Sequence, residues 1–279
     1  MKIALSAEST IDLSEELLER FNIQTIAFGI TFNNELTEDR PGISQEIFEF
    51  VDKTKVLPKT SAISPDQYRE YFDKLKKDYD AVLHISLSSN LSSSYNNARL
   101  ASQELENVYV VDSKNLATGI AHVALYARDL IDKNLPVEEI YEKTQSMTDR
   151  VRSSFILDKL NYMYKGGRCN AVTLLGANLL KIKPQIVVSQ GRMGVGKKYR
   201  GPLPKVISTY VDELLEENPN ADKSLVFITH SSSMPEEEKI AYDKLKKAGF
   251  KTIYNTYAGG TVCSHCGPNT LGVLFVEKE

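Results

Sequence analysis

Short apolar runs alternate with amphipathic helical patterns along the first half of this chain of 279 residues. Residues 2–7, 81–87 and 108–112 have the length and apolar content of buried strands, and helical spacing of apolar residues separates them. Strands that alternate with helices are typical of a parallel sheet with helical crossovers. The alternation therefore predicts an α/β fold and argues against an all-helical or all-strand chain.

The clearest helix start is the segment Ser64-Pro65-Asp66-Gln67. It offers a serine at the N-cap, a proline at the first helical position and a glutamine where a capping box needs it. We expect one further strand, at 24–32, that ends in the turn pair Asn33-Asn34. The helices expected in this half are 14–21, 44–53, 65–75, 92–105, 115–131 and 137–151.

The second half has a different pattern. Residues 184–189 and 197–200 flank three glycines and predict a hairpin. Because this half mixes hairpin and crossover signals, we expect an α+β domain at 151–279, next to a parallel-sheet α/β domain at 1–150. Its expected helices are 174–180, 205–217 and 236–248, and its other strands are 153–156, 225–229, 252–256 and 271–276.

Charge and cysteine content restrict the class of protein. The chain has 34 Lys and Arg against 37 Asp and Glu, which gives a net charge of −3. This weakly acidic balance argues against nucleic acid as the main partner, because nucleic-acid binders normally carry a basic stripe. The chain's three cysteines do not make a disulfide framework. No signal peptide or membrane-spanning run is recognisable, so we expect a cytoplasmic protein.

Residues 191–198, GRMGVGKK, fit the first part of a phosphate-binding loop. A working loop needs Ser or Thr after the lysine, to bind magnesium, and then a helix. Here Lys198 follows, and the chain continues as strand and turn. We therefore interpret the segment as a glycine-rich hairpin and not as a nucleotide site.

The segment Cys263-Ser264-His265-Cys266 places three potential metal ligands in four residues. A structural zinc site needs four ligands, and no second pair of ligands is evident in the sequence, although Cys169 is a candidate for one more. A redox pair and plain buried thiols are the alternatives. We predict no metal and no cofactor. His265 stands out because it lies in a loop bounded by glycine and proline, and such loops often carry function.

Hydroxyl side chains gather where strands meet helices. Ser88–Ser94 follow one strand, Thr60-Ser61 precede the helix capped by Ser64, and Ser9-Thr10 follow the first strand. Ligands of parallel sheets bind beyond the carboxyl ends of the strands, where helix N-termini offer free N–H groups. These hydroxyls predict either a site for a carboxylate or phosphate, or simple helix caps.

The order of these segments resembles the DegV family, the fatty-acid-binding proteins of bacterial fatty acid kinase systems. The resemblance covers nearly the whole chain, and four positions depart from the family's usual residues: Glu8 for Asp, Ala62 for Gln, Ser93 for Gly and Asn269 for Gly. The segments that carry it are ESTIDL at 8–13, TSAISP at 60–65, SSNLSSSY at 88–95, GGR at 166–168, KP at 183–184 and HCGP at 265–268 with Leu271-Gly272.

The resemblance implies two α/β domains with a long-chain fatty acid buried between them. It implies that Thr60, Ser92 and His265 bind the carboxylate, with Ser61 and Ser93 beside them. It also implies no catalytic residue in this chain: a separate dihydroxyacetone-kinase-like enzyme would use ATP to make the acyl phosphate that enters phospholipid metabolism. Arg168 is then a candidate kinase contact or a surface ion pair, and transient contact with a membrane surface is expected.

Two other classes of function compete with this interpretation. The first is a stand-alone phosphotransferase or hydrolase that uses the serine cluster and His265. The second is a small-molecule sensor with a short polar pocket. Neither a hydrolase elbow (G-x-S-x-G) nor an H-E-x-x-H metalloprotease motif is present. Acyl length, unsaturation and oligomeric state do not follow from the sequence.

Overall fold

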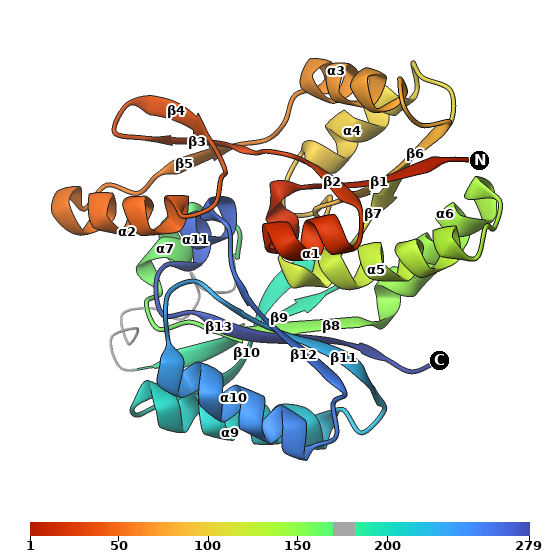
Figure 1. Cartoon of the computed structure of the whole chain (residues 1–279). Coiled ribbons are helices and arrows are strands. Elements are labelled where there is room, and N and C mark those ends of the chain that lie inside the picture. The colour runs from red at the N-terminus through yellow and green to blue at the C-terminus, as the bar shows by residue number, and fades with distance from the viewer. Residues whose placement is uncertain (170–181) are drawn as a thin grey trace.

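The computed structural model describes residues 1–169 and 182–279, and its first half is built on a parallel sheet (Figure 1). This sheet has the strand order β2-β1-β6-β7, and every pair in it is parallel. Its elements are β1 (Ile3–Glu8), β2 (Ile23–Ile26), β6 (Ala81–Ser86) and β7 (Val108–Asp112), with helices α1 (Glu15–Arg20), α3 (Pro65–Leu75), α4 (Ser94–Ser102), α5 (Thr118–Asp132) and α6 (Val137–Met147). The predicted α/β architecture is confirmed in this half.

The second half is built on a mixed sheet with the order β10-β9-β8-β13-β11-β12. The pair β11–β12 is parallel and its other pairs are antiparallel. Its strands are β8 (Val151–Ile156), β9 (Lys183–Ser189), β10 (Arg192–Tyr199), β11 (Ala221–His230), β12 (Thr252–Tyr257) and β13 (Leu271–Glu277), and helices α9 (Leu203–Glu217) and α10 (Pro235–Lys247) accompany them. The glycine-rich segment forms the expected hairpin between β9 and β10.

A third, small sheet was not expected from the sequence. The predicted strand 24–32 is two strands: β2 joins the parallel sheet, whereas β3 (Gly29–Phe32) pairs with β4 (Glu35–Glu38) and β5 (Lys59–Ser61). The β3–β4 turn is Asn33-Asn34, and both residues have positive φ, as tight hairpin turns require. Helix α2 (Ile43–Thr54) packs beside this sheet through Ile43 and Ile47.

Some helices and loops of the structure also differ from the predicted ones. The predicted helix 137–151 ends at Met147, and a single 3-10 turn, η2 (Thr148–Arg150), leads into β8. The expected loop around His265 is a short helix, α11 (Gly260–Cys266), and a further helix, α7 (Asn161–Gly166), was missed. The expected helix 174–180 lies outside the described residues.

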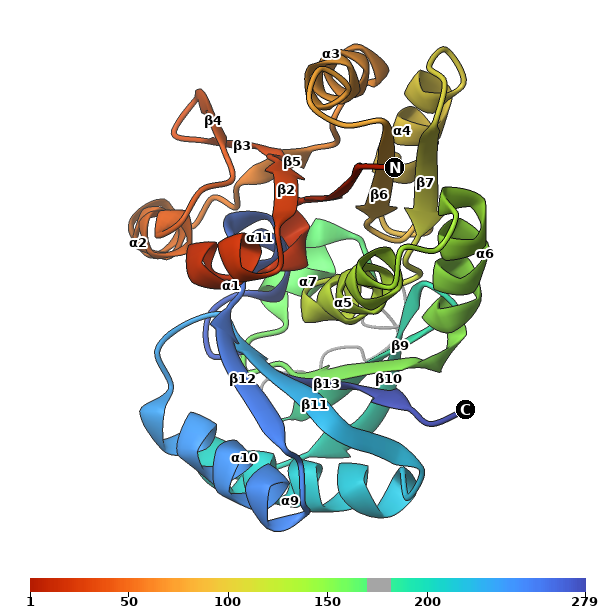
Figure 2. The same ribbon diagram turned by 45° about the vertical axis from the view of Figure 1, so that its right-hand side comes forward.

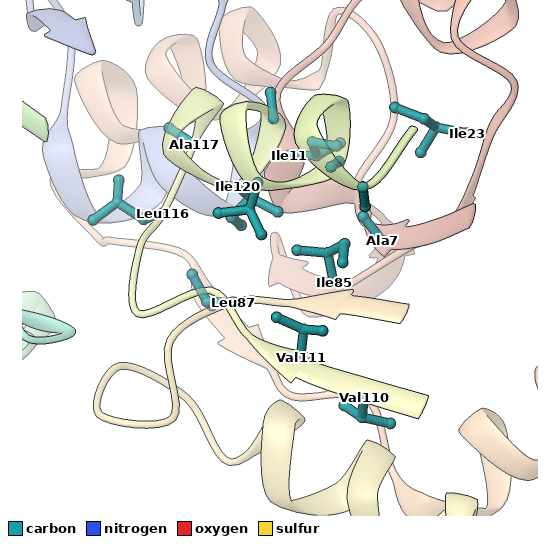
Figure 3. Close-up of a cluster of buried hydrophobic side chains, with 14 of the residues drawn as sticks. Ala7, Ile11, Ile23, Ile85, Leu87, Val110, Val111, Leu116, Ala117 and Ile120 are labelled. Carbon is teal, nitrogen blue, oxygen red and sulfur yellow. The ribbon is translucent and has the colours of Figure 1, made fainter. Parts of the chain in front are cut away.

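Helix α5 lies between the two large sheets (Figure 2). It contacts β1 and β6 on one side and β8 and β13 on the other. Most of its side chains are buried, and one hydrophobic cluster continues from the parallel sheet across α5 to Phe227 and Leu274 of the mixed sheet. Figure 3 shows the part of this cluster around Ile85, Val111 and Ile120. The layers are α3 and α4, the parallel sheet, α5, the mixed sheet, then α9 and α10.

The buried histidine of α5 joins the two halves. His122 Nε2 donates to the carbonyl oxygen of Leu274 in β13 over 2.9 Å, and the ring packs edge-on against Phe227. Burial lowers the pKa of His122 to about 4. The ring is therefore neutral at pH 7, and its protonation at lower pH favours the unfolded chain.

We predict that His122→Gln reduces the acid sensitivity of the fold. The histidine pKa of about 4 in the folded state lies below the value of about 6.5 for an unfolded chain, so stability is lost as pH falls between these two values. The loss from this one group is about 3 kcal/mol. A glutamine amide keeps a donor for Leu274 and does not titrate. Urea unfolding at a series of pH values should show a shallower decline for the variant, and parallel curves for the two proteins would contradict the assignment.

Candidate functional site

A cavity that opens to solvent, about 660 Å³ with the adjoining solvent included, lies beyond the carboxyl ends of the parallel strands, against α11 and β5. Most of its wall is apolar, and its polar side chains come from both halves of the chain. Its lining residues are Thr10, Phe28, Thr60, Ala62, Leu87, Leu91, Ser92, Ser93, Leu116, Arg168, Met193, Thr261, Val262, His265 and Cys266. The structure thus brings the predicted residues Thr60, Ser92, Ser93, Arg168 and His265 around one space.

Thr60 and His265 meet across the cavity although they lie 205 residues apart in the sequence. A 2.9 Å hydrogen bond joins Thr60 Oγ1 to His265 Nε2. Thr60 belongs to β5, in which successive side chains point to opposite faces. Ser61 therefore points away: its side chain is exposed and is not part of the cavity wall.

Ser92 and Ser93 lie in the turn between β6 and α4. The backbone N–H of Ser92 donates to the carbonyl oxygen of Ser88, and the hydroxyl oxygen of Ser92 accepts from the N–H of Ser94 over 3.1 Å. Because this hydroxyl acts as an acceptor within the turn, its own hydrogen can be donated to a ligand. The turn therefore aims a neutral donor into the cavity.

The hairpin that resembled a phosphate loop supports this turn. Ser88 Oγ donates to the carbonyl oxygen of Gly191 over 2.8 Å, and Asn90 Nδ2 donates to that of Gln190. Gly191 has φ of +75°, and a Cβ there would lie 2.5 Å from Ser88 Oγ. Glycine is required here for close contact between the two halves of the chain.

A fully buried carboxylate fixes the end of β6 where the turn begins. Glu8 accepts hydrogen bonds from Tyr68 Oη at 2.7 Å, Ser86 Oγ at 2.6 Å and the Leu87 N–H at 2.9 Å. Burial by itself raises the pKa of Glu8, but the adjacent His84 ring and the hydroxyl donors outweigh burial and lower it below its usual value. In the sequence, Glu8 is recognisable only as a departure from the family pattern, and this role was not predicted.

Two aspartates hold the start of α11, whose last turn carries His265. Asp39 accepts from the N–H groups of Gly260 and Thr261 at 2.7 and 3.0 Å, and from Ser9 Oγ. Asp12 accepts from the Gly259 N–H at 2.9 Å, but its second oxygen has no hydrogen-bond partner among the described residues. Burial raises the pKa of Asp12 well above its usual value, and the charge of Asp39 adds to the increase.

The ring of His265 fits against a glycine of α7. A Cβ at Gly166 would lie 2.6 Å from His265 Nδ1, and this nitrogen has no hydrogen-bond partner in the described part of the chain. Burial, and then the positive charge of Arg168, lower the pKa of His265 to about 4. The exposed Arg168 donates from Nη1 to the carbonyl oxygen of Gly166 at the cavity rim. At neutral pH the histidine is an uncharged hydrogen-bonding group.

All three cysteine side chains are buried. Burial raises the pKa of Cys263 well above its usual value and that of Cys266 to about 12, so neither is ionised at pH 7. Within residues 1–169 and 182–279, no group of three or more His, Cys, Asp and Glu side chains is placed to hold a metal ion. None of the described helices is long and apolar enough to cross a membrane.

Neutral donors in the wall of a mostly apolar cavity are the groups that an amphipathic ligand would need. The chain matches, over residues 2–278, the family model described as "Uncharacterised protein, DegV family". This protein belongs to the DegV family, and the resemblance stated from its motifs is confirmed.

Individual relatives agree with this assignment. A fatty acid-binding protein of Thermotoga maritima is 28% identical over 279 residues, which cover 98% of this chain and 96% of the relative. The crystal structure of DegV, a fatty acid binding protein from Bacillus subtilis, matches with a TM-score of 0.86 and 28% identity over 100% of both chains. A DegV family protein of Thermus thermophilus, whose structure is described by its fatty acid binding, has a TM-score of 0.92 at 22% identity over 100% of both chains and supports the fold.

We predict that Gly166→Ala displaces the His265 ring. The added methyl group cannot lie 2.6 Å from Nδ1, so the ring moves and its bond to Thr60 lengthens or breaks. NMR titration should then show the pKa of His265 rising from about 4 toward the ordinary value near 6.5. Gly194→Ala is a matched control, because a Cβ there meets nothing within 4 Å. An unchanged His265 titration in Gly166→Ala would refute the packing argument.

We predict opposite effects of removing the two carboxylates near α11. The raised pKa of Asp12 means that its ionised form destabilises the fold, so stability falls as pH rises from about 4 to that raised pKa. Asp12→Asn should therefore be more stable than the parent at alkaline pH and lose this advantage below about pH 4. Asp39→Asn removes one of two accepting oxygens and should lower the free energy of unfolding by about 1–3 kcal/mol. Urea unfolding at acidic and alkaline pH checks both, and equal effects would contradict the different roles.

Proposed function

We propose that this protein binds a long-chain fatty acid in the cavity, with the carboxylate at the Thr60–Ser92–His265 end. The observation that carries the proposal is that hydroxyl and imidazole groups line one cavity whose wall is otherwise mostly apolar. A carboxylate needs hydrogen-bond donors, and a hydrocarbon tail needs an apolar wall. The fatty acid binding named for family relatives supports the same ligand class.

The donors would bind the carboxylate without a full positive charge. The Ser92 hydroxyl hydrogen is free for a ligand, and Ser93 lies beside it in the same wall. Thr60 and His265 share one hydrogen bond. When His265 is the donor in that bond, the hydroxyl hydrogen of Thr60 can be donated to the carboxylate as a second hydrogen bond. Hydrogen bonds to a charged group contribute about 1.5–3 kcal/mol each, which is enough to orient the ligand. The carboxylate held in this way would remain accessible to a partner protein.

The tail would supply most of the binding free energy. Burial of about 14 methylenes contributes roughly 11 kcal/mol at ~0.8 kcal/mol each. Association and ordering oppose this by roughly 4–15 kcal/mol. The free energy gained by burying the tail can therefore be cancelled by the cost of association. Whether the complex is stable then depends on the carboxylate contacts.

We further propose that the protein presents the carboxylate to a separate ATP-dependent kinase of the dihydroxyacetone-kinase type. Arg168, exposed at the rim of the cavity, is then placed to meet that kinase or its phosphates. The ligand would be taken up during transient contact with a membrane surface, since long acyl chains partition strongly into lipid. The un-ionised thiols of Cys263 and Cys266 fit work in a reducing cytoplasm.

A stand-alone hydrolase is the weaker alternative. Thr60 and His265 are within hydrogen-bond distance, as a nucleophile and a base would be. A catalytic histidine, however, needs a third group on its other nitrogen, and His265 Nδ1 has no partner among the described residues. The low pKa of His265, about 4, also makes it a weak base at pH 7.

We predict that Ser92→Ala weakens fatty acid binding about 10- to 100-fold, because it removes one hydrogen bond to a charged group. Thr60→Ala should have a smaller effect, since Thr60 acts in part through His265. Ser61→Ala is the matched control: it is the adjacent hydroxyl, and it lies outside the cavity wall. Displacement of a fluorescent fatty acid by oleate measures all three affinities. Binding by the Ser92 variant as tight as that of the parent would overturn the carboxylate assignment.

A further inference from the structure

Two threonine hydroxyls in the cavity wall are not among the groups proposed to hold the carboxylate. Thr10 belongs to η1 (Ser9–Ile11), the 3-10 turn that follows β1, and Thr261 lies in the first turn of α11. Both residues line the cavity and are buried, with exposed fractions of 0% and 5%. Neither Oγ1 atom has a hydrogen-bond partner among the described residues. The wall therefore holds two polar groups whose hydrogen-bonding capacity the fold does not use.

The segments that carry these hydroxyls meet at one atom. Asp39 Oδ2 accepts from Ser9 Oγ at 3.2 Å and from the Thr261 N–H at 3.0 Å. Ser9 Oγ also accepts from the N–H of Phe28, another residue of the cavity wall, at 3.2 Å. Because Thr10 follows Ser9 directly, the two threonines are held on adjoining parts of the same wall.

The position of Thr261 on its helix places this pair relative to the carboxylate. Thr261 lies four residues before His265, so the two side chains share one face of α11, about 6 Å apart along the helix axis. His265 is the residue bonded to Thr60, where we propose that the carboxylate lies. The two hydroxyls are therefore one helical turn from that position, beside the first carbons of an acyl chain.

The chemistry of this pair favours a neutral oxygen group on the ligand. A threonine hydroxyl both donates and accepts, so a ligand hydroxyl between two threonines can donate to one and accept from the other. A plain hydrocarbon segment would remove water from both threonines and give no hydrogen bond in return, which is unfavourable. A second carboxylate would be repelled by Asp39, which accepts from the Thr261 N–H.

We propose that Thr10 and Thr261 form a hydroxyl-binding position in the cavity, and that the preferred ligand is a fatty acid with a hydroxyl group on one of the carbons near its carboxylate. This proposal rests on the proposed fatty acid function and narrows its ligand class. The ligand hydroxyl bridges the two threonines, and the rest of the acyl chain continues along the apolar part of the wall.

The position of the hydroxyl along the acyl chain tests this proposal in the parent protein. Displacement of a fluorescent fatty acid should be compared for hexadecanoic acid and for its 3-hydroxy, 5-hydroxy and 16-hydroxy derivatives. The better of the 3-hydroxy and 5-hydroxy acids should bind about 10-fold more tightly than the 16-hydroxy acid, whose hydroxyl meets no partner. One enantiomer of the better acid should also bind more tightly than the other, because the two threonines are fixed by the fold.

Two variants remove the threonine hydroxyls one at a time. Thr10→Val and Thr261→Val replace each hydroxyl by a methyl group and keep the branched shape of the side chain. Each should weaken binding of the preferred hydroxy acid about 10-fold and should tighten binding of hexadecanoic acid, since no hydroxyl is then covered without a partner. A variant that folds poorly would weaken both acids, so opposite changes identify the hydroxyl position.

Thr144→Val is the matched control. Thr144 of α6 is also fully buried, and its Oγ1 has no hydrogen-bond partner in the described part of the chain, but it does not line the cavity. This variant should leave the ratio of the two affinities unchanged.

The outcomes separate this proposal from the proposed function. If the parent binds none of the acids, the fatty acid function itself fails. If it binds them but prefers neither the 3-hydroxy nor the 5-hydroxy acid to the 16-hydroxy acid, the hydroxyl position is refuted and the fatty acid function stands. The same conclusion follows if the valine variants change hexadecanoic acid and the hydroxy acids by one common factor, as they would if the threonines bound only water.

Discussion

The packing of α5 between two sheets is the constraint on which the site depends. This helix is buried on both sides, so the carboxyl ends of the parallel strands are held at a fixed distance from the mixed sheet and from α11. The hydrogen bond from His122 to Leu274 ties the helix to β13 within that packing. The hydroxyls of one half and the histidine of the other can then face one cavity, and the hydrocarbon wall is continuous with the core that joins the halves.

Polar groups near the cavity divide into two kinds with different energetic roles. Glu8 and Asp39 are buried acceptors with several donors each, and they fix the turn after β6 and the start of α11. Removing such an acceptor leaves buried donors without partners, which costs more than the hydrogen bond contributes when it is formed. Ser92 and the Thr60–His265 pair keep hydrogen-bonding capacity for a ligand instead. A rigid polar frame therefore supports a small set of groups that are free to bind.

Local signals predicted much of this fold, and contacts distant in the sequence account for what was missed. The capping box at Ser64 and the turn at Asn33-Asn34 depend on neighbouring residues, and both form as expected. The division of residues 24–32 into β2 and β3 depends on pairing with β1 on one side and with β5 on the other, which no local pattern encodes. Helix α11 was expected as a loop because glycines begin and follow it, and it depends on Asp39, more than 200 residues earlier.

The site was predictable by residue type more than by geometry. Hydroxyls at strand ends indicated the segments that hold Thr60, Ser92 and Ser93, and the family resemblance selected residues within them together with His265; these four residues do line one cavity. Ser61 could have been separated from Thr60 by the alternation of a strand, but the strand itself was not recognised. The supporting roles of Glu8, Gly166 and Gly191 appear only when segments far apart in the chain are brought together.

Denaturing extraction of the purified protein, followed by mass spectrometry of the extract, tests the central claim most directly. A protein that holds an acyl chain in this cavity should release a long-chain fatty acid in a ratio near one per chain, and the mass of that acid reports the preferred length and unsaturation. Protein that contains no fatty acid, and that also fails to bind added oleate and palmitate, would contradict the account.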